Sequence, residues 1–171
     1  MRKINKLRLI LWPECNRNCE GCCNKDWDVS NLQEISDYRD FDFIMLTGGE
    51  PMLNPGKVKQ AIQEIRIQNF RAPIILYTAS PCFSLVRLLE ILNGITVSLH
   101  DQKSVADFKK FLGMLRPEDT RNKSLRLNVF TGIDISELDL FEWVVKTDIE
   151  WIENCPLPPG ETLRRWKPTT L

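Results

Sequence analysis

Three cysteines, Cys15, Cys19 and Cys22, follow one another in the spacing C-x3-C-x2-C and are the residues best suited to chemistry. The segment that carries them, WPECNRNCEGCCN at 12–24, contains Pro13 and several asparagine and glycine residues that disfavour a regular helix or strand. Thiolates this close together on a loop suit a soft metal centre, either zinc or an iron-sulfur cluster.

The number of ligands separates these two centres. A structural zinc site takes four protein ligands and an electron-transfer cluster usually takes four cysteines, whereas this spacing supplies three. Cys23 is a poor fourth ligand because adjacent side chains diverge, and His100, the only histidine, lies far along the sequence. The spacing therefore favours a cluster with one open iron, and the alternative is a zinc loop completed by a distant residue.

A second segment, LTGGEPMLN at 46–54, follows the next apolar run. Gly48 and Gly49 let the backbone approach a ligand closely and take positive φ angles. Glu50 can accept a charge-assisted hydrogen bond from an ammonium group. By itself G-G-E-P is also compatible with an ordinary β-to-α turn. The pairing of C-x3-C-x2-C after one strand with G-G-E-P after the next resembles the radical S-adenosylmethionine superfamily.

That resemblance implies a [4Fe-4S] cluster on the three cysteines, with S-adenosylmethionine on the open iron. Reductive cleavage would then give a 5'-deoxyadenosyl radical that abstracts hydrogen from a substrate, while the GGEP segment binds the methionyl amino group. The implied cofactor contacts are Gly48, Gly49, Glu50 and Pro51, the strand residues Thr78, Ser98 and Asn128, and the carbonyl of Gly21. For Thr78, Ser98 and Asn128 the alternative is an ordinary structural role in or beside a strand.

The segment CEGCCNKDW is similar to the corresponding segment of the small activating enzymes of anaerobic ribonucleotide reductase. This local resemblance implies a glycyl radical enzyme as the protein substrate. A nucleoside-like small molecule or a peptide is the alternative substrate, and a noncatalytic iron-sulfur or zinc module is the alternative function. Because the sequence has no second cluster motif, the electron must come from an external donor such as flavodoxin or ferredoxin.

Further candidates for chemistry are Cys82, Cys155 and His100, each placed after an expected strand end. The cysteines can act as hydrogen donors or redox groups, and the histidine can transfer a proton. The alternatives are small buried hydrophobic residues for the cysteines and a surface loop for the histidine.

Composition excludes several classes. With 23 basic and 23 acidic residues the formal charge is zero, which gives no indication of nucleic acid or an anionic membrane as a partner. Arg8 interrupts the amino-terminal apolar run, so it does not read as a signal peptide, and no stretch reaches the roughly 20 apolar residues of a membrane span. Six cysteines in ligand spacing without an export signal predict a cytoplasmic protein without a disulfide framework.

The pattern around these residues is an alternation of strands and helices. It predicts strands at 7–12, 43–47, 73–78, 95–99, 125–130 and 150–153, with helices at 28–38, 58–65, 85–92, 104–115 and 136–146, the fourth opened by a capping pair of Ser104 and Asp107. Such alternation predicts an α/β fold with parallel strands and right-handed crossovers. A complete eight-stranded barrel needs about 250 residues. We therefore expect an open partial (β/α)6 TIM-like barrel as a single domain at 1–155, and a tail at 156–171 that covers an open edge or the bottom of the sheet, or orders only against a partner.

Overall fold

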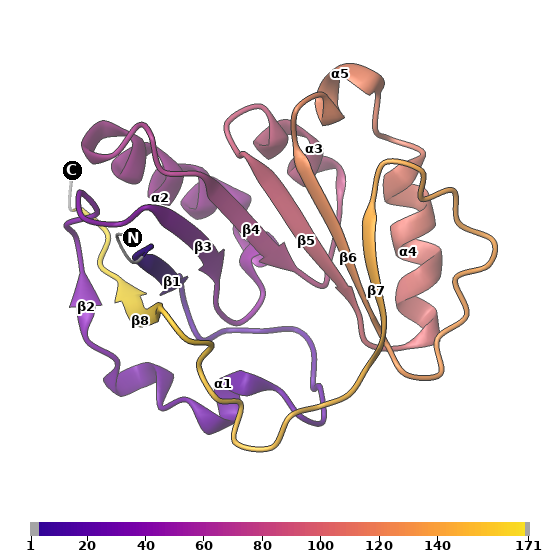
Figure 1. Ribbon diagram of the computed structural model, residues 1–171, viewed down its shortest axis with the longest axis horizontal. Helices are drawn as coiled ribbons and strands as arrows, with labels where there is room; N and C mark the ends of the chain where they lie inside the picture. The colour runs from indigo at the N-terminus through magenta and orange to yellow at the C-terminus, as the bar shows by residue number, and fades with distance from the viewer. Residues whose placement is uncertain (1–3, 170–171) are drawn as a thin grey trace.

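One sheet of eight parallel strands organises the molecule. The computed structural model describes residues 4–169, and its strands lie in the order β2-β8-β1-β3-β4-β5-β6-β7 without closing into a barrel (Figure 1). The α/β fold expected from the sequence is therefore confirmed, and its open sheet is compatible with a partial TIM-like barrel. The strands are β1 Lys6–Ile10, β2 Glu34–Ile35, β3 Phe43–Thr47, β4 Ile74–Thr78, β5 Gly94–Leu99, β6 Ser124–Phe130, β7 Val144–Ile149 and β8 Glu161–Trp166.

Helices cover one face of this sheet. The longer ones, α2 Pro55–Gln68, α3 Phe83–Leu89 and α4 Gln102–Leu112, connect successive strands and lie along the same side (Figure 1). Their apolar sides and alternate strand residues form one core; the buried strand residues include Leu7, Leu9, Ile44, Leu46, Ile95 and Val97. Because side chains alternate across a strand, the residues between these point to the inner face of the curled sheet. Short elements complete the chain: α1 Cys23–Asp26, α5 Pro117–Thr120 and the 3-10 turns Val29–Asn31 and Pro51–Leu53.

The strand expected at 43–47 is confirmed to the residue, and those at 7–12, 73–78, 95–99 and 125–130 are confirmed with small shifts in their ends. The expected helix at 28–38 is wrong, because this segment forms a single 3-10 turn followed by the short strand β2. Asn31 bonds back to Asp28 through its side chain at 2.7 Å, which favours a tight turn over a continued helix.

Two expectations near the carboxyl end are also wrong. The segment 136–146 does not form a helix, and β7 runs through its end, where Val144 and Val145 are β-branched residues that suit a strand. Residues 150–153 follow β7 and are not a strand.

The segment expected as a tail at 156–171 contains the strand β8. This strand lies between β1 and β2, so it extends the sheet past β1. Trp166 is 3% exposed, and its indole N–H donates to Glu64 of α2 at 2.9 Å. The edge of β1 is thereby covered, and the sheet has eight strands instead of six; residues 170–171 of the tail lie outside the described residues.

Among residues 4–169, none of the helices has both the length and the apolar character needed to cross a bilayer.

Candidate functional site

The expected site residues converge at the carboxyl ends of the strands. The cysteine loop leaves β1, the GGEP segment leaves β3, and Thr78 and Ser98 lie at the ends of β4 and β5. They line one cavity of about 250 Å³. Of the residues expected from the sequence, the cavity is lined by Cys15, Cys19, Cys22, Gly48, Gly49, Glu50, Thr78, Ser98, His100 and Asn128.

The GGEP segment packs backbone to backbone against the cysteine loop. The Gly49 N–H donates to the Trp12 carbonyl at 2.7 Å, and the Glu50 N–H donates to the Glu14 carbonyl at 2.9 Å. A Cβ at Gly49 would overlap the Glu14 carbonyl, and Gly48 has a φ of +143° that side chains rarely adopt. Both glycines are therefore required to bring these two segments together.

Glu50 is a buried carboxylate that ties the turn to β4. It is 2% exposed, and it accepts hydrogen bonds from the Met52 N–H at 2.9 Å, the Ala79 N–H at 2.9 Å and the Thr78 hydroxyl. Three donors offset the cost of burying the charge. The carboxylate thus holds the GGEP turn against the end of β4, at the wall of the cavity.

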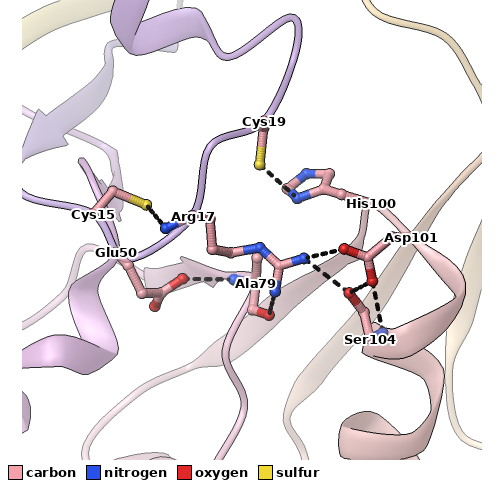
Figure 2. Close-up of polar contacts among 8 residues, drawn as sticks. All are labelled: Cys15, Arg17, Cys19, Glu50, Ala79, His100, Asp101 and Ser104. Atoms are coloured by element: carbon pink, nitrogen blue, oxygen red, sulfur yellow. Dashed lines mark hydrogen bonds and ion pairs between the residues drawn. The ribbon is translucent and has the colours of Figure 1, made fainter.

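Arg17 anchors the cysteine loop to the residue after β4 and to the start of α4 (Figure 2). Its guanidinium donates to the Ala79 carbonyl at 3.1 Å, to Asp101 at 3.1 Å and to the Ser104 hydroxyl at 2.9 Å. The Ala79 carbonyl accepts from Arg17 and the Ala79 N–H donates to Glu50, so the backbone of one residue links the two motifs.

Asp101 is the N-cap of α4, and it accepts from the Ser104 N–H at 2.8 Å and the Ser104 hydroxyl at 2.7 Å. The capping pair expected from Ser104 and Asp107 is therefore wrong, because the N-cap is Asp101, three residues before Ser104. Hydrogen bonds from Ser104, together with the nearby charge of Arg17, hold the pKa of Asp101 below its usual value.

Cys19 and His100 lie side by side (Figure 2). The Cys19 sulfur is 3.4 Å from His100 Nδ1. The imidazole packs against Phe130 and Trp151, with ring centroids 4.7 and 5.1 Å away. Burial, with the nearby Arg17 charge, lowers the pKa of His100 to about 4, so the ring is neutral at pH 7.

The free thiols of the cavity form the donor set of a candidate metal centre. Cys15, Cys19 and Cys22 are free, and partial burial raises the pKa of the Cys15 thiol. As they stand, no three His, Cys, Asp or Glu side chains among residues 4–169 are grouped tightly enough to hold a single metal ion. Each cysteine of a cluster binds a different iron, so cluster ligands stand further apart than the ligands of one ion. Three free thiols around one cavity fit that donor set.

Four expected site residues lie elsewhere. Pro51 is the buried first residue of the 3-10 turn Pro51–Leu53. Gly21 lies directly against Trp151, since an added Cβ would be 2.5 Å from the Trp151 side chain. Cys82 packs against the hydrophobic core before α3, so its role in the cavity is not supported. Cys155 does not line the cavity as a free thiol, because it forms a disulfide with Cys23.

That disulfide corrects the expectation of a chain without disulfides. It joins positions 132 residues apart and ties the segment after β7 to the end of the cysteine loop. The Trp27 indole N–H donates to the Cys155 carbonyl at 2.9 Å, which reinforces the same connection. The pairing also removes Cys23 from the free thiols, in agreement with its rejection as a ligand.

Sequence reasoning missed several residues of the cavity. The Asn24 side chain donates to the Gly48 carbonyl at 2.6 Å. Its position in the C-x-G-C-x-N motif could have marked it as a site residue. Arg8 forms an ion pair with Glu161 of β8 at 2.7 Å and lies over the Tyr77 ring at 5.3 Å, on the inner face of the sheet. Trp151 covers Gly21 and His100, and nothing in its local sequence predicted that contact.

Comparison with known proteins gives a family. None of the curated proteins matches the chain. The family model described as a 4Fe-4S single cluster domain matches residues 6–126, which run from β1 into β6 and include the three spaced cysteines and the GGEP segment. Since this match covers most of the chain, the protein belongs to the 4Fe-4S single cluster domain family, with a [4Fe-4S] cluster as its cofactor.

Proposed function

We propose that this protein is a radical S-adenosylmethionine enzyme. Its family is one found in radical S-adenosylmethionine-type proteins. The observation that carries the proposal is the convergence of three free cysteines, the GGE turn and the strand residues Ser98 and Asn128 on one cavity. A pure electron carrier needs the cysteines, but it has no need of a shaped cavity beside them.

Cys15, Cys19 and Cys22 would hold the cluster by three of its irons. A cluster held there would supply the electron for reductive cleavage of S-adenosylmethionine to methionine and a 5'-deoxyadenosyl radical, and that radical would take hydrogen from the substrate. The protein residues bind and orient the cofactor and exclude water.

The GGE turn would bind the methionyl amino group. Glu50 contributes a negative charge at the cavity wall, and its three internal hydrogen bonds fix that charge in place. Ser98 and Asn128 are paired across β5 and β6, so their polar side chains lie at one level of the inner face, where they would contact the ribose or the carboxylate. Phe130 and Trp151, whose ring centroids are 4.2 Å apart, supply an apolar wall for the adenine.

The proposed substrate is a glycyl radical enzyme, and a small molecule or peptide is the alternative. The open sheet supports a macromolecular substrate, because the described strands leave the barrel unclosed. An external one-electron donor such as flavodoxin or ferredoxin would reduce the cluster.

A second candidate function is electron transfer without S-adenosylmethionine. The contact between His100 and Cys19 favours it, since a nearby imidazole is a potential fourth protein ligand. This candidate predicts that all four irons have protein ligands and that S-adenosylmethionine does not change the spectrum of the reduced cluster.

The test uses the full chain, reconstituted anaerobically with iron and sulfide and reduced with dithionite. On addition of S-adenosylmethionine, 5'-deoxyadenosine should form, and the Cys19→Ser variant should not produce it. A Cys82→Ser variant is the matched control, because this free thiol lies outside the cavity, and it should retain wild-type product formation. A fully loaded, reducible cluster that gives no 5'-deoxyadenosine would favour electron transfer.

A further inference from the structure

The contact between His100 and Cys19 is the feature that the proposed function does not use. Nδ1 of the imidazole is 3.4 Å from the cysteine sulfur, within the range of a hydrogen bond to sulfur. His100 also lies at a boundary, because it and Cys19 both line the cavity and a second, polar hollow of about 480 Å³.

The imidazole is held in this orientation from several directions. Phe130 meets it edge to face and Trp151 stacks against it at a tilt. The following residue, Asp101, is fixed by Arg17 and by its capping bonds to Ser104. These contacts fix both the ring and its backbone, and they hold Nδ1 facing Cys19.

The chemistry of a metal-bound thiolate determines the direction of the hydrogen bond. Such a sulfur has no proton to donate, so it can only accept. An imidazole nitrogen facing it must therefore carry the proton, because two lone pairs at this distance would repel. His100 then donates through Nδ1–H and leaves Nε2 as the acceptor nitrogen.

We infer that His100 donates a hydrogen bond to the Cys19 thiolate and thereby raises the reduction potential of the cluster. Reduction adds negative charge to the cluster and its thiolates, so a donor at one sulfur stabilises the reduced form more than the oxidised form. His100 is in this assignment a positioning and tuning residue rather than an iron ligand. The inference rests on Cys19 as a cluster ligand, which is part of the proposed function.

The test measures the cluster potential by a redox titration followed by electron paramagnetic resonance, without S-adenosylmethionine. His100→Phe retains an aromatic ring against Phe130 and Trp151 but removes the donor. We expect its one-electron reduction equilibrium to shift at least tenfold toward the oxidised form, which is about 59 mV lower in potential. His100→Asn places an amide N–H near the position of Nδ1 and should recover at least half of that shift.

Iron and sulfide content, measured on the same samples, separates tuning from ligation. Tuning predicts wild-type iron content and an unchanged type of cluster signal in both variants. An unchanged potential in His100→Phe overturns the inference, and so does a loss of iron, which would make His100 a ligand. If His100→Phe does not fold by circular dichroism, His100→Leu provides the second donorless variant and is judged by the same outcomes.

These results are distinguishable from a failure of the proposed function. A potential shift in His100→Phe together with no 5'-deoxyadenosine from the wild type would leave the tuning role in place and overturn the radical enzyme. Formation of 5'-deoxyadenosine by the wild type, with no potential shift in His100→Phe, would support the radical enzyme and overturn the tuning role.

Discussion

The substitution Gly49→Ala tests whether the cysteine loop and the GGEP turn form one locked unit. An added Cβ would overlap the Glu14 carbonyl and lie 2.6 Å from the Pro13 carbonyl oxygen. All of these neighbours are backbone atoms of the cysteine loop, so no side-chain rotation can relieve the overlap. The two segments must therefore move apart.

The cost follows from the contacts that this movement breaks. The Gly49 N–H bond to Trp12 at 2.7 Å and the Glu50 N–H bond to Glu14 at 2.9 Å join the segments. Their loss costs about 1–3 kcal/mol at about 0.5–1.5 for each bond, and the overpacking adds about 1–3 kcal/mol. Even the lower total, about 2 kcal/mol, lowers the urea midpoint by about 1 M if the m-value is about 2 kcal/mol/M.

The assay is urea unfolding of the metal-free protein, followed by circular dichroism, which measures this contact separately from cluster binding. Gly56→Ala is the matched control, because the same added methyl group in α2 meets nothing nearer than Asn54 Oδ1 at 3.6 Å. It should leave stability unchanged or raise it by about 0.5–1 kcal/mol. Reconstitution of Gly49→Ala should also yield less cluster than the control. If Gly49→Ala unfolds within about 0.5 kcal/mol of the wild type, the ordinary range of a surface substitution, the interlocking of the two segments is refuted.

Three further predictions concern the anchors of the loop. Arg17→Leu removes the bonds to Ala79, Asp101 and the Ser104 hydroxyl, so we expect slower cluster assembly and faster loss of the cluster in air, both visible in the absorbance of the iron-sulfur chromophore; equal rates would exclude the anchor. Cys155→Ser should lower the free energy of unfolding by about 2–4 kcal/mol under oxidising conditions, and a thiol reductant should abolish the difference from wild type. The lowered pKa of Asp101 stabilises the fold above the ordinary value of 3.8, and this contribution is lost as the pH falls through the folded-state pKa. Acid titrations followed by circular dichroism should therefore show a flatter loss of stability below about pH 4 for Asp101→Asn than for wild type.

The order of the strands explains why the two motifs and their anchors lie close together. In a parallel sheet the carboxyl ends of neighbouring strands open at the same edge. β1, β3 and β4 are neighbours, so the cysteine loop, the GGEP turn and Ala79 meet without long connections. Glu50 accepts a hydrogen bond from the Ala79 N–H, Arg17 donates one to the Ala79 carbonyl, and these two bonds fix the spacing of the motifs.

The sequence by itself determined the features that depend on local chemistry. The cysteine spacing indicated a metal loop, and a family model of a 4Fe-4S domain supports that interpretation. The alternation of apolar runs predicted the α/β class, and β3 was placed to the residue because the apolar run from Phe43 begins after Asp42 and ends at Gly48 and Gly49. The need for glycine at 48 and 49 was also predictable, since close backbone approach tolerates no side chain.

Tertiary structure alone decided the features whose partners are distant in the chain. β8 pairs with β1 from the other end of the sequence, and no local window predicts that partner. β7 has β-branched residues that suit a strand, but its pairing with β6 is set by the sheet. Arg17 finds Asp101 84 residues away, and Cys19 finds His100 81 residues away. Where a side chain has several potential partners, the fold decides which of them comes within hydrogen-bonding distance. His100, which lies far from the cysteines in sequence, is consequently in contact with one of the proposed cluster ligands.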